Sequence, residues 1–199
     1  EDLSRRVQAK MFGHHLLERH LLDVDGLTGA DLDLVMRTAD AMREVLARPI
    51  AKVPALRGRN VTILFYEAST RTRVSFEVAA KNLSADVVNI AASTSSVTKG
   101  ESLVDTVRTI ESLGANMLVM RHATSGAPYL AAEVFSGSVL NGGDGWHAHP
   151  TQALLDLYTM RSHLGDLRRR KVVIVGDILH SRVVRSNLWG LAALGAHIV

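Results

Sequence analysis

The sequence has no cysteine among its 199 residues, so disulfides, thiolate zinc sites and cysteine nucleophiles are all excluded. Long hydrophobic runs are also missing, because the apolar stretches fall far short of the roughly 20 residues that a membrane-spanning helix needs. No signal peptide is recognisable, since the first twenty residues carry charges throughout and lack a small-residue cleavage site. These absences favour a globular protein of the cytoplasm with no membrane partner.

The chain also has few aromatic residues and a small net charge. Aromatic residues make up 5% of the chain, and the formal net charge is only +3. The one basic run, Arg168 to Lys171, stands just before the apolar run VVIV, where a loop is expected. A solvated surface patch explains such a run better than a nucleic-acid site, and few side chains are present to stack on bases. We therefore expect no nucleic-acid partner.

What is present is an alternation of short apolar runs and helical patterns. Apolar strands separated by single helices are typical of βαβ units, in which a parallel sheet is covered on both faces. The sequence therefore predicts an α/β fold, a doubly wound parallel sheet with helices on both faces. The expected strands are Val61–Tyr66, Val87–Ile90, Met117–Met120, Val139–Leu140, Val172–Val175 and His197–Val199. The expected helices are one with a Thr28 N-cap and apolar spacing from Leu32 to Leu46, and five over 72–84, 101–113, 127–135, 150–163 and 182–194.

The βαβ pattern starts again at Lys171 and runs to Val199. About 30 residues are too few for a doubly wound sheet, so we expect the start of a second, truncated α/β domain there. Residues 1–20 are charged and show no clear core pattern, and we interpret them as an N-terminal extension.

The stretch STRTR, Ser69 to Arg73, places hydroxyl groups and two arginines directly after the apolar run VTILFY. Arginine is unfavourable in the first turn of a helix, where the macrodipole is positive. A bound anion would offset that charge, and hydroxyls, free N–H groups and guanidinium groups at a helix N-terminus together bind phosphate. The alternative is a helix capped by Ser69 or Thr70 with two solvated arginines. The density of polar groups after a buried strand favours phosphate.

A second polar cluster lies in NGGDGWHAHPTQ, Asn141 to Gln152. Its three glycines allow the backbone to turn sharply after a strand. Pro150 suits the first position of a helix, which makes His149 the N-cap and Gln152 the third helical residue. Both side chains would then face the strand ends, where open α/β sheets bind ligands. The histidine pair HAH could suggest a metal, but no third ligand follows at a supporting spacing, and a lone histidine is by default a structural cap.

Three further signals are weaker. Arg121 follows the strand MLVM, where a charged residue is often only a surface edge. The loop AASTSSVTKGES carries Lys99; such a loop is usually mobile surface, although its lysine could reach a phosphate. Arg182 begins the helix after VVIVG, and the lack of GxGxxG there argues against a dinucleotide site.

Taken in order, STRTRVSFE, SSVTKGES, MRH and GDG…HPTQALLDL resemble the aspartate/ornithine carbamoyltransferases over about Arg19 to Val199. STRTR together with HPTQ is highly specific to carbamoyltransferases. Ornithine carbamoyltransferase shares both motifs, whereas the KGES loop and NGGDG…HPTQALLDL are most similar to the aspartate carbamoyltransferase catalytic chain. The family's later amino-acid-recognition arginine and Pro-Leu turn have no counterpart in these residues.

The resemblance implies transfer of the carbamoyl group of carbamoyl phosphate to the amine of L-aspartate, the committed step of pyrimidine synthesis. Catalysis would rest on positioning and charge stabilisation, with no metal or other cofactor. The implied phosphate site consists of Ser69, Thr70, Arg71, Thr72, Ser95 (or its neighbour Ser96) and Lys99. The implied carbamoyl site consists of Arg121, His149, Pro150 and Gln152, and the aspartate site includes Lys99 and Arg182. The implied catalytic residues are Arg71, Thr72, Lys99, Arg121, His149 and Gln152.

The same resemblance divides the chain. Residues 21–149 would form the carbamoyl-phosphate-binding domain, 150–165 an interdomain helix and 166–199 the start of the aspartate-binding domain. Ser95 and Lys99 would reach into a neighbouring subunit's site in a homotrimer, and a regulatory chain or a dihydroorotase would be further partners. Two other interpretations stay open: an ornithine carbamoyltransferase, and a non-catalytic carbamoyl-phosphate-binding homologue or assembly scaffold.

Overall fold

The computed structural model describes residues 19–91 and 101–199. Its main sheet has four parallel strands in the order β2-β1-β3-β4. The strands are β1 (Asn60–Phe65), β2 (Asp86–Ala91), β3 (Met117–His122) and β4 (Ser138–Asp144). Because β1 lies between β2 and β3, the strand order reverses at β1, as in a doubly wound sheet. The predicted α/β fold is confirmed.

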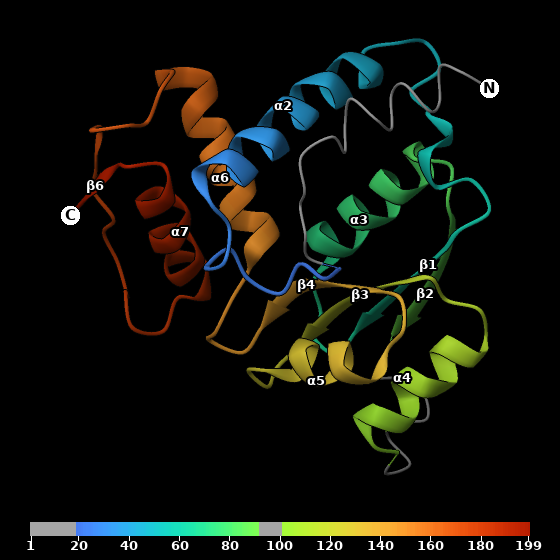
Figure 1. Cartoon of the computed structure of the whole chain (residues 1–199). Coiled ribbons are helices and arrows are strands. Elements are labelled where there is room, and N and C mark those ends of the chain that lie inside the picture. Colours follow the sequence, from blue (N-terminus) through green and yellow to red (C-terminus); the bar gives the residue numbers. More distant parts are fainter. Residues whose placement is uncertain (1–18, 92–100) are drawn as a thin grey trace.

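Helices cover both faces of this sheet (Figure 1). Helix α3 (Thr70–Asn82) connects β1 to β2 on one face, and a single 3₁₀ turn, η1 (Pro54–Leu56), precedes β1. Helices α4 (Leu103–Ser112) and α5 (Ala127–Val134) lie on the opposite face. Successive side chains of a strand point to opposite faces. Accordingly, Ile63 packs with Ala80 of α3, whereas Leu64 packs with Ile110 of α4.

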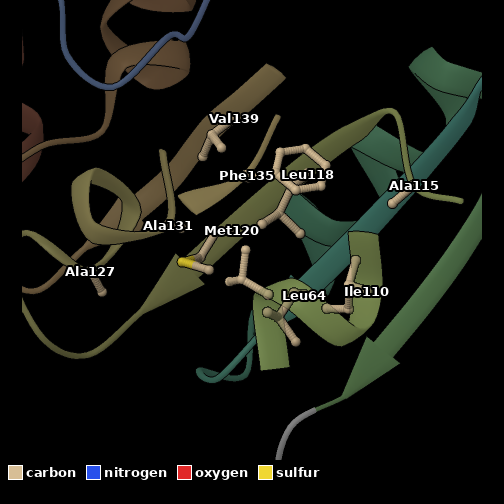
Figure 2. Close-up of a cluster of buried hydrophobic side chains, with 10 residues drawn as sticks. Leu64, Ile110, Ala115, Leu118, Met120, Ala127, Ala131, Phe135 and Val139 are labelled. Carbon is tan, nitrogen blue, oxygen red and sulfur yellow. The ribbon is translucent and has the colours of Figure 1, made fainter. Parts of the chain in front are cut away.

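The larger of these two cores lies beneath α4 and α5 (Figure 2). Strand side chains such as Leu118 and Met120 meet Ala131 and Phe135 there, and all four are almost fully buried. A third core lies beside the sheet, between α2 (Gly29–Leu46), α6 (Pro150–Leu164) and α7 (Arg182–Ala193). Helix α6 therefore carries the chain from the sheet to this third core.

The third core also contains the second βαβ unit that the sequence predicts. Strands β5 (Lys171–Val172) and β6 (His197–Ile198) pair in parallel, with α7 between them. A polar cluster fixes α6 against α2, since the Tyr158 hydroxyl donates to Asp40 over 2.8 Å and Arg161 pairs with the same carboxylate. Thr28 and Asp31 form a capping box at the start of α2, which confirms the predicted cap.

Several predicted boundaries were wrong. Strand β5 ends at Val172 instead of Val175, and Val175 is 89% exposed. Helix α3 begins at Thr70, two residues earlier than predicted. Strand β4 continues past Leu140 to Asp144, so Gly142 and Gly143 lie within the strand and the turn begins after it.

The remaining features are the basic run, the N-terminal end of the described chain and the length of the helices. The basic run 168–171 is exposed, as expected; its first three residues precede β5, and Lys171 is the first residue of that strand. Of the expected N-terminal extension, only residues 19 and 20 are described. Leu21 bonds to β4 on both sides of Leu140, from its N–H to the Val139 carbonyl and from its carbonyl to the Asn141 N–H. Over residues 19–91 and 101–199, none of the helices is both long and apolar enough to cross a membrane.

Candidate active site

The polar clusters that the sequence singles out meet at the carboxyl edge of the main sheet. Phe65, the last residue of β1, pairs in register with Arg121 of β3, and His122 pairs with Asp144 at the end of β4. The segment after β1 begins α3, and the segment after β4 begins α6. Two helix N-termini and Arg121 are thereby brought to one edge of the sheet, where open α/β sheets bind ligands.

The N-terminus of α3 leaves donors available. Ser69 occupies the N-cap position, but its hydroxyl makes no capping hydrogen bond, so the alternative of a helix capped by the Ser69 side chain is not borne out. The N–H groups of Thr70, Arg71 and Thr72 precede the first helical hydrogen bond, which runs from Arg73 N–H to the Ser69 carbonyl. Arg71 is exposed and Thr72 half-buried. This helix start therefore presents N–H groups, hydroxyls and one guanidinium for an anion.

Two arginines converge on one carboxylate at the centre of the site. Nε of Arg121 lies 3.1 Å from Oε2 of Glu67, and Nη1 and Nη2 of Arg182 each lie 3.3 Å from the same oxygen. The Arg121 contact lacks hydrogen-bond geometry, so its buried Nε has no hydrogen-bond partner. Burial and the Arg182 charge lower the pKa of Arg121, while Glu67 opposes that change. Two cations this close together create a site for a carboxylate or phosphate.

Backbone carbonyls of the glycine segment orient both arginines. Arg121 Nη1 donates to the Gly142 carbonyl over 3.2 Å, and Arg182 Nη1 donates to the Gly145 carbonyl over 2.9 Å. Gly143 has a φ of +115°, and a Cβ atom there would lie 3.1 Å from Arg121 Nη1 and 3.2 Å from Arg182 Cζ. The backbone conformation therefore favours glycine at position 143, and the close approach of the two guanidinium groups adds to this preference.

His149 is the N-cap of α6, as predicted, and is only 7% exposed. Its Nδ1 atom is buried without a hydrogen-bond partner. Burial, and then the positive charges of Arg121 and Arg182, lower its pKa to about 4. The imidazole is therefore neutral at pH 7, and it can donate one N–H to a ligand oxygen without adding a charge.

The residues that follow His149 are placed only partly as predicted. Pro150 is buried at the first position of α6. Gln152 is the third helical residue, but its Nε2 donates to Asp156 over 2.9 Å, so its amide does not face the strand ends as predicted. Asp156 lies one helical turn further along α6, and its carboxylate accepts the hydrogen bond that the sequence pattern leaves available for a ligand.

A buried carboxylate fixes the turn between β4 and α6. Asp144 is fully buried, and its oxygens accept hydrogen bonds from Asn141 Nδ2 and from the N–H groups of Gly126 and Ala148. His147 Nδ1 lies 3.1 Å from the same carboxylate. Within the described part of the chain, no group of three or more His, Asp or Glu side chains is arranged to hold a metal ion.

The sequence predicted Arg121 and Arg182 as site residues but missed Glu67, the carboxylate between them. The available signal was its position in FYEASTRTR, where one acidic residue stands between a buried strand and a cluster of arginines. Ser95, Ser96 and Lys99, which the sequence assigned to a phosphate-reaching loop, lie outside the described residues.

The site as built suits one kind of ligand. A helix N-terminus with Arg71 can hold a phosphate, and two further guanidiniums can hold a second anionic group. The neutral imidazole of His149, which lies close enough to Arg121 and Arg182 for their charges to lower its pKa, can donate to a carbonyl oxygen. Such a site would bind a small molecule with separated anionic groups around a polar centre.

Comparison with known proteins identifies the family. Residues 19–162 match the model of the family described as aspartate/ornithine carbamoyltransferase, carbamoyl-P binding domain. The aspartate carbamoyltransferase catalytic subunit of Chloroflexus aggregans is 64% identical over 180 residues, which are 90% of this chain and 58% of that protein. The catalytic subunit of Heliobacterium modesticaldum is 53% identical, with the same two coverages.

Solved structures give the same result. Aspartate transcarbamoylase from Trypanosoma cruzi, in complex with carbamoyl phosphate and aspartate, aligns with a TM-score of 0.82 and 36% identity. The alignment covers 90% of this chain and 58% of that chain. The complex of the same enzyme with N-(phosphonacetyl)-L-aspartic acid gives the same TM-score and identity, with 55% of that chain covered. This chain thus spans less than two thirds of the length of these relatives.

Proposed function

This chain belongs to the aspartate/ornithine carbamoyltransferase family, and we propose that it carries the carbamoyl-phosphate site of an aspartate carbamoyltransferase. The enzyme transfers the carbamoyl group of carbamoyl phosphate to the amine of L-aspartate and releases N-carbamoyl-L-aspartate and phosphate. The names of its relatives, including one at 64% identity, favour aspartate over ornithine as the acceptor.

One observation carries the proposal. Arg121 and Arg182 come from segments about 60 residues apart, and both contact the same oxygen of Glu67. The two guanidinium groups form an anion site, and the carboxylate of Glu67 occupies it in this structure. Substrate anions can bind the same arginines when they displace Glu67 from them.

The phosphate of carbamoyl phosphate would bind at the start of α3. Ser69, Thr70 and Thr72 supply hydroxyls and N–H groups, and Arg71 supplies a guanidinium that can bind two phosphate oxygens. The Ser69 hydroxyl supports this role, because no helix-capping bond engages it. Ser95 and Lys99 of the loop would contribute further phosphate contacts.

The carbonyl group would then lie between β3 and the start of α6. The aspartate amine attacks the carbonyl carbon, the carbonyl oxygen takes up the electron pair, and Thr72, Arg121 and His149 stabilise the resulting oxyanion. A neutral His149 acts here by hydrogen bonding, in agreement with its lowered pKa. The Pro150 carbonyl and a Gln152 amide released from Asp156 orient the carbamoyl nitrogen.

Collapse of this intermediate breaks the bond from carbon to the phosphate oxygen. The phosphate leaves with the electron pair of that bond and accepts the proton lost by the amine, so no side chain has to act as a general base. Arg182 and Lys99 bind the aspartate carboxylates. Preorganised charges and orientation supply the rate enhancement.

The wider arrangement belongs to the same proposal. Residues 21–149 form the carbamoyl-phosphate-binding domain, 150–165 the interdomain helix, and 166–199 the beginning of the aspartate-binding domain. The enzyme is a cytoplasmic homotrimer of pyrimidine synthesis whose active sites are shared between subunits, with Ser95 and Lys99 donated by a neighbour. A regulatory chain or a dihydroorotase would be its further partners.

The test is product formation from carbamoyl phosphate with each of two amines. The intact protein is supplied with carbamoyl phosphate and either L-aspartate or L-ornithine, and N-carbamoylaspartate and citrulline are quantified. We expect N-carbamoylaspartate alone, and an Arg121→Ala variant as the matched control should form none above background. Citrulline as the main product would establish the ornithine enzyme. Binding of carbamoyl phosphate without either product would establish the non-catalytic homologue.

A further inference from the structure

Three segments that are far apart in the sequence meet behind His149. Ser186 of α7 is fully buried, and its hydroxyl donates to Oδ1 of Asp23 over 2.9 Å. The Ser186 Oγ atom in turn accepts the backbone N–H of His149 over 3.0 Å. A hydrogen-bonded chain therefore runs from Asp23, ahead of α2, through Ser186 to His149, the N-cap residue of α6.

The single proton of the Ser186 hydroxyl makes this chain directional. A hydroxyl carries one hydrogen and two lone pairs, whereas an ionised carboxylate only accepts. With its hydrogen directed to Asp23, Ser186 presents a lone pair to the His149 N–H. If the hydroxyl turned, the buried N–H of His149 would lose its acceptor, and an unsatisfied buried donor is unfavourable.

Asp23 is itself held in place relative to the sheet. Its Oδ1 accepts the Val24 N–H over 2.7 Å. Two residues earlier, Leu21 bonds to β4 through the Val139 carbonyl and the Asn141 N–H, each over 2.9 Å. Strand β4 leads into the turn that ends at His149. The backbone of His149 is thus connected to β4 in two ways. One connection is the covalent chain through the turn, and the other is the hydrogen-bonded route through Ser186 and Asp23 to the segment that Leu21 ties to β4.

We propose that Asp23 is a positioning residue that acts through Ser186 on the His149 backbone and so holds the imidazole at the carbonyl oxygen of the substrate. This proposal rests on the proposed function for its catalytic consequence. Asp23 does not touch the substrate itself. The phosphate contacts at the start of α3 are independent of this chain of hydrogen bonds, so its loss should lower kcat and spare the KM for carbamoyl phosphate.

The experiment compares Asp23→Ala, Ser186→Ala and the double variant in the intact protein. Each single variant should lower kcat about tenfold, the effect of losing one net hydrogen bond, and should change the KM for carbamoyl phosphate less than twofold. The double variant should be no slower than Ser186→Ala, because both changes break one chain. Asp23→Asn should recover most of the activity, since its amide oxygen still accepts from Ser186. Asp25→Ala removes an exposed carboxylate two residues away and is the matched control, expected at the wild-type kcat.

A second measurement needs no substrate and separates this proposal from the proposed function. Hydrogen exchange at the His149 amide should be slow in the wild type and in Asp25→Ala, and markedly faster in Asp23→Ala and Ser186→Ala. If Asp23→Ala does not accumulate as folded protein, Asp23→Asn and Ser186→Ala decide by the same measurements. An unchanged His149 amide, or kcat losses that multiply in the double variant, would overturn the positioning role. An inactive wild type with a protected His149 amide would contradict the proposed function alone.

Discussion

The low pKa of His149 makes a quantitative prediction about folding stability. The pKa is about 4 in the folded protein and about 6.5 for an unperturbed histidine. The difference corresponds to about 3 kcal/mol between the folded and unfolded states. Because the unfolded chain takes up a proton that the folded protein does not, the free energy of unfolding falls as the pH drops below about 6.5 and levels off below about 4.

The test is a substitution that removes this titration. His149→Gln keeps a polar side chain that does not take up a proton in this range. Between pH 7.5 and pH 5, the wild type should lose about 2 kcal/mol more unfolding free energy than His149→Gln, as worked from the two pKa values. Urea unfolding at both pH values measures the loss. His163, an exposed residue of α6, supplies the control His163→Gln, whose loss should equal that of the wild type. Equal losses in the wild type and His149→Gln would show that His149 is not the source of this pH dependence.

Three further predictions address the anion sites. Arg71→Ala should lower kcat by a factor of about 10² to 10³, and carbamoyl phosphate at a hundred times its Kd should stabilise only the wild type, by about 2.7 kcal/mol; equal melting shifts in both proteins would contradict the phosphate role. Gly143→Ala should lower kcat and the melting temperature, because a φ of +115° is strained for alanine and the added Cβ would lie 3.1 Å from Arg121 Nη1. Wild-type kinetics and an unchanged melting temperature would contradict this expectation. Lys99→Ala and Arg71→Ala chains that are dissociated and mixed should recover about a quarter of the wild-type activity. In a randomly assembled ring, one interface in four joins a pocket with Arg71 to a neighbouring loop with Lys99. Activity at the level of the separate mutants would show that Lys99 serves its own chain.

The sequence predicted those parts of the molecule that depend on local patterns. Apolar strands, the Thr28 cap and Pro150 at the first position of α6 are local signals, and all are found in the structure. The continuation of β4 through Gly142 and Gly143 was missed, because glycines normally weaken a strand. At Gly143 the φ of +115° and the close approach of the Arg121 and Arg182 guanidinium groups favour glycine.

The contacts at the site could not be predicted in the same way. The pairing of Glu67 with Arg121 and Arg182 joins three segments, and nothing in the local sequence specifies which arginines a carboxylate will meet. Asp23 and Ser186 likewise lie 163 positions apart. The motifs predict which residues would face a ligand, whereas the residues that contact those side chains could be found only from the fold.

The most direct test of the proposed carbamoyl-phosphate site is a crystal structure of the intact protein with carbamoyl phosphate bound. We expect phosphate oxygens within hydrogen-bond distance of Arg71 and of the N–H groups at the start of α3. We also expect the carbonyl oxygen within hydrogen-bond distance of Arg121 and His149. A phosphate bound elsewhere, or an Arg121 and a His149 that contact only protein atoms in the complex, would contradict the proposed site.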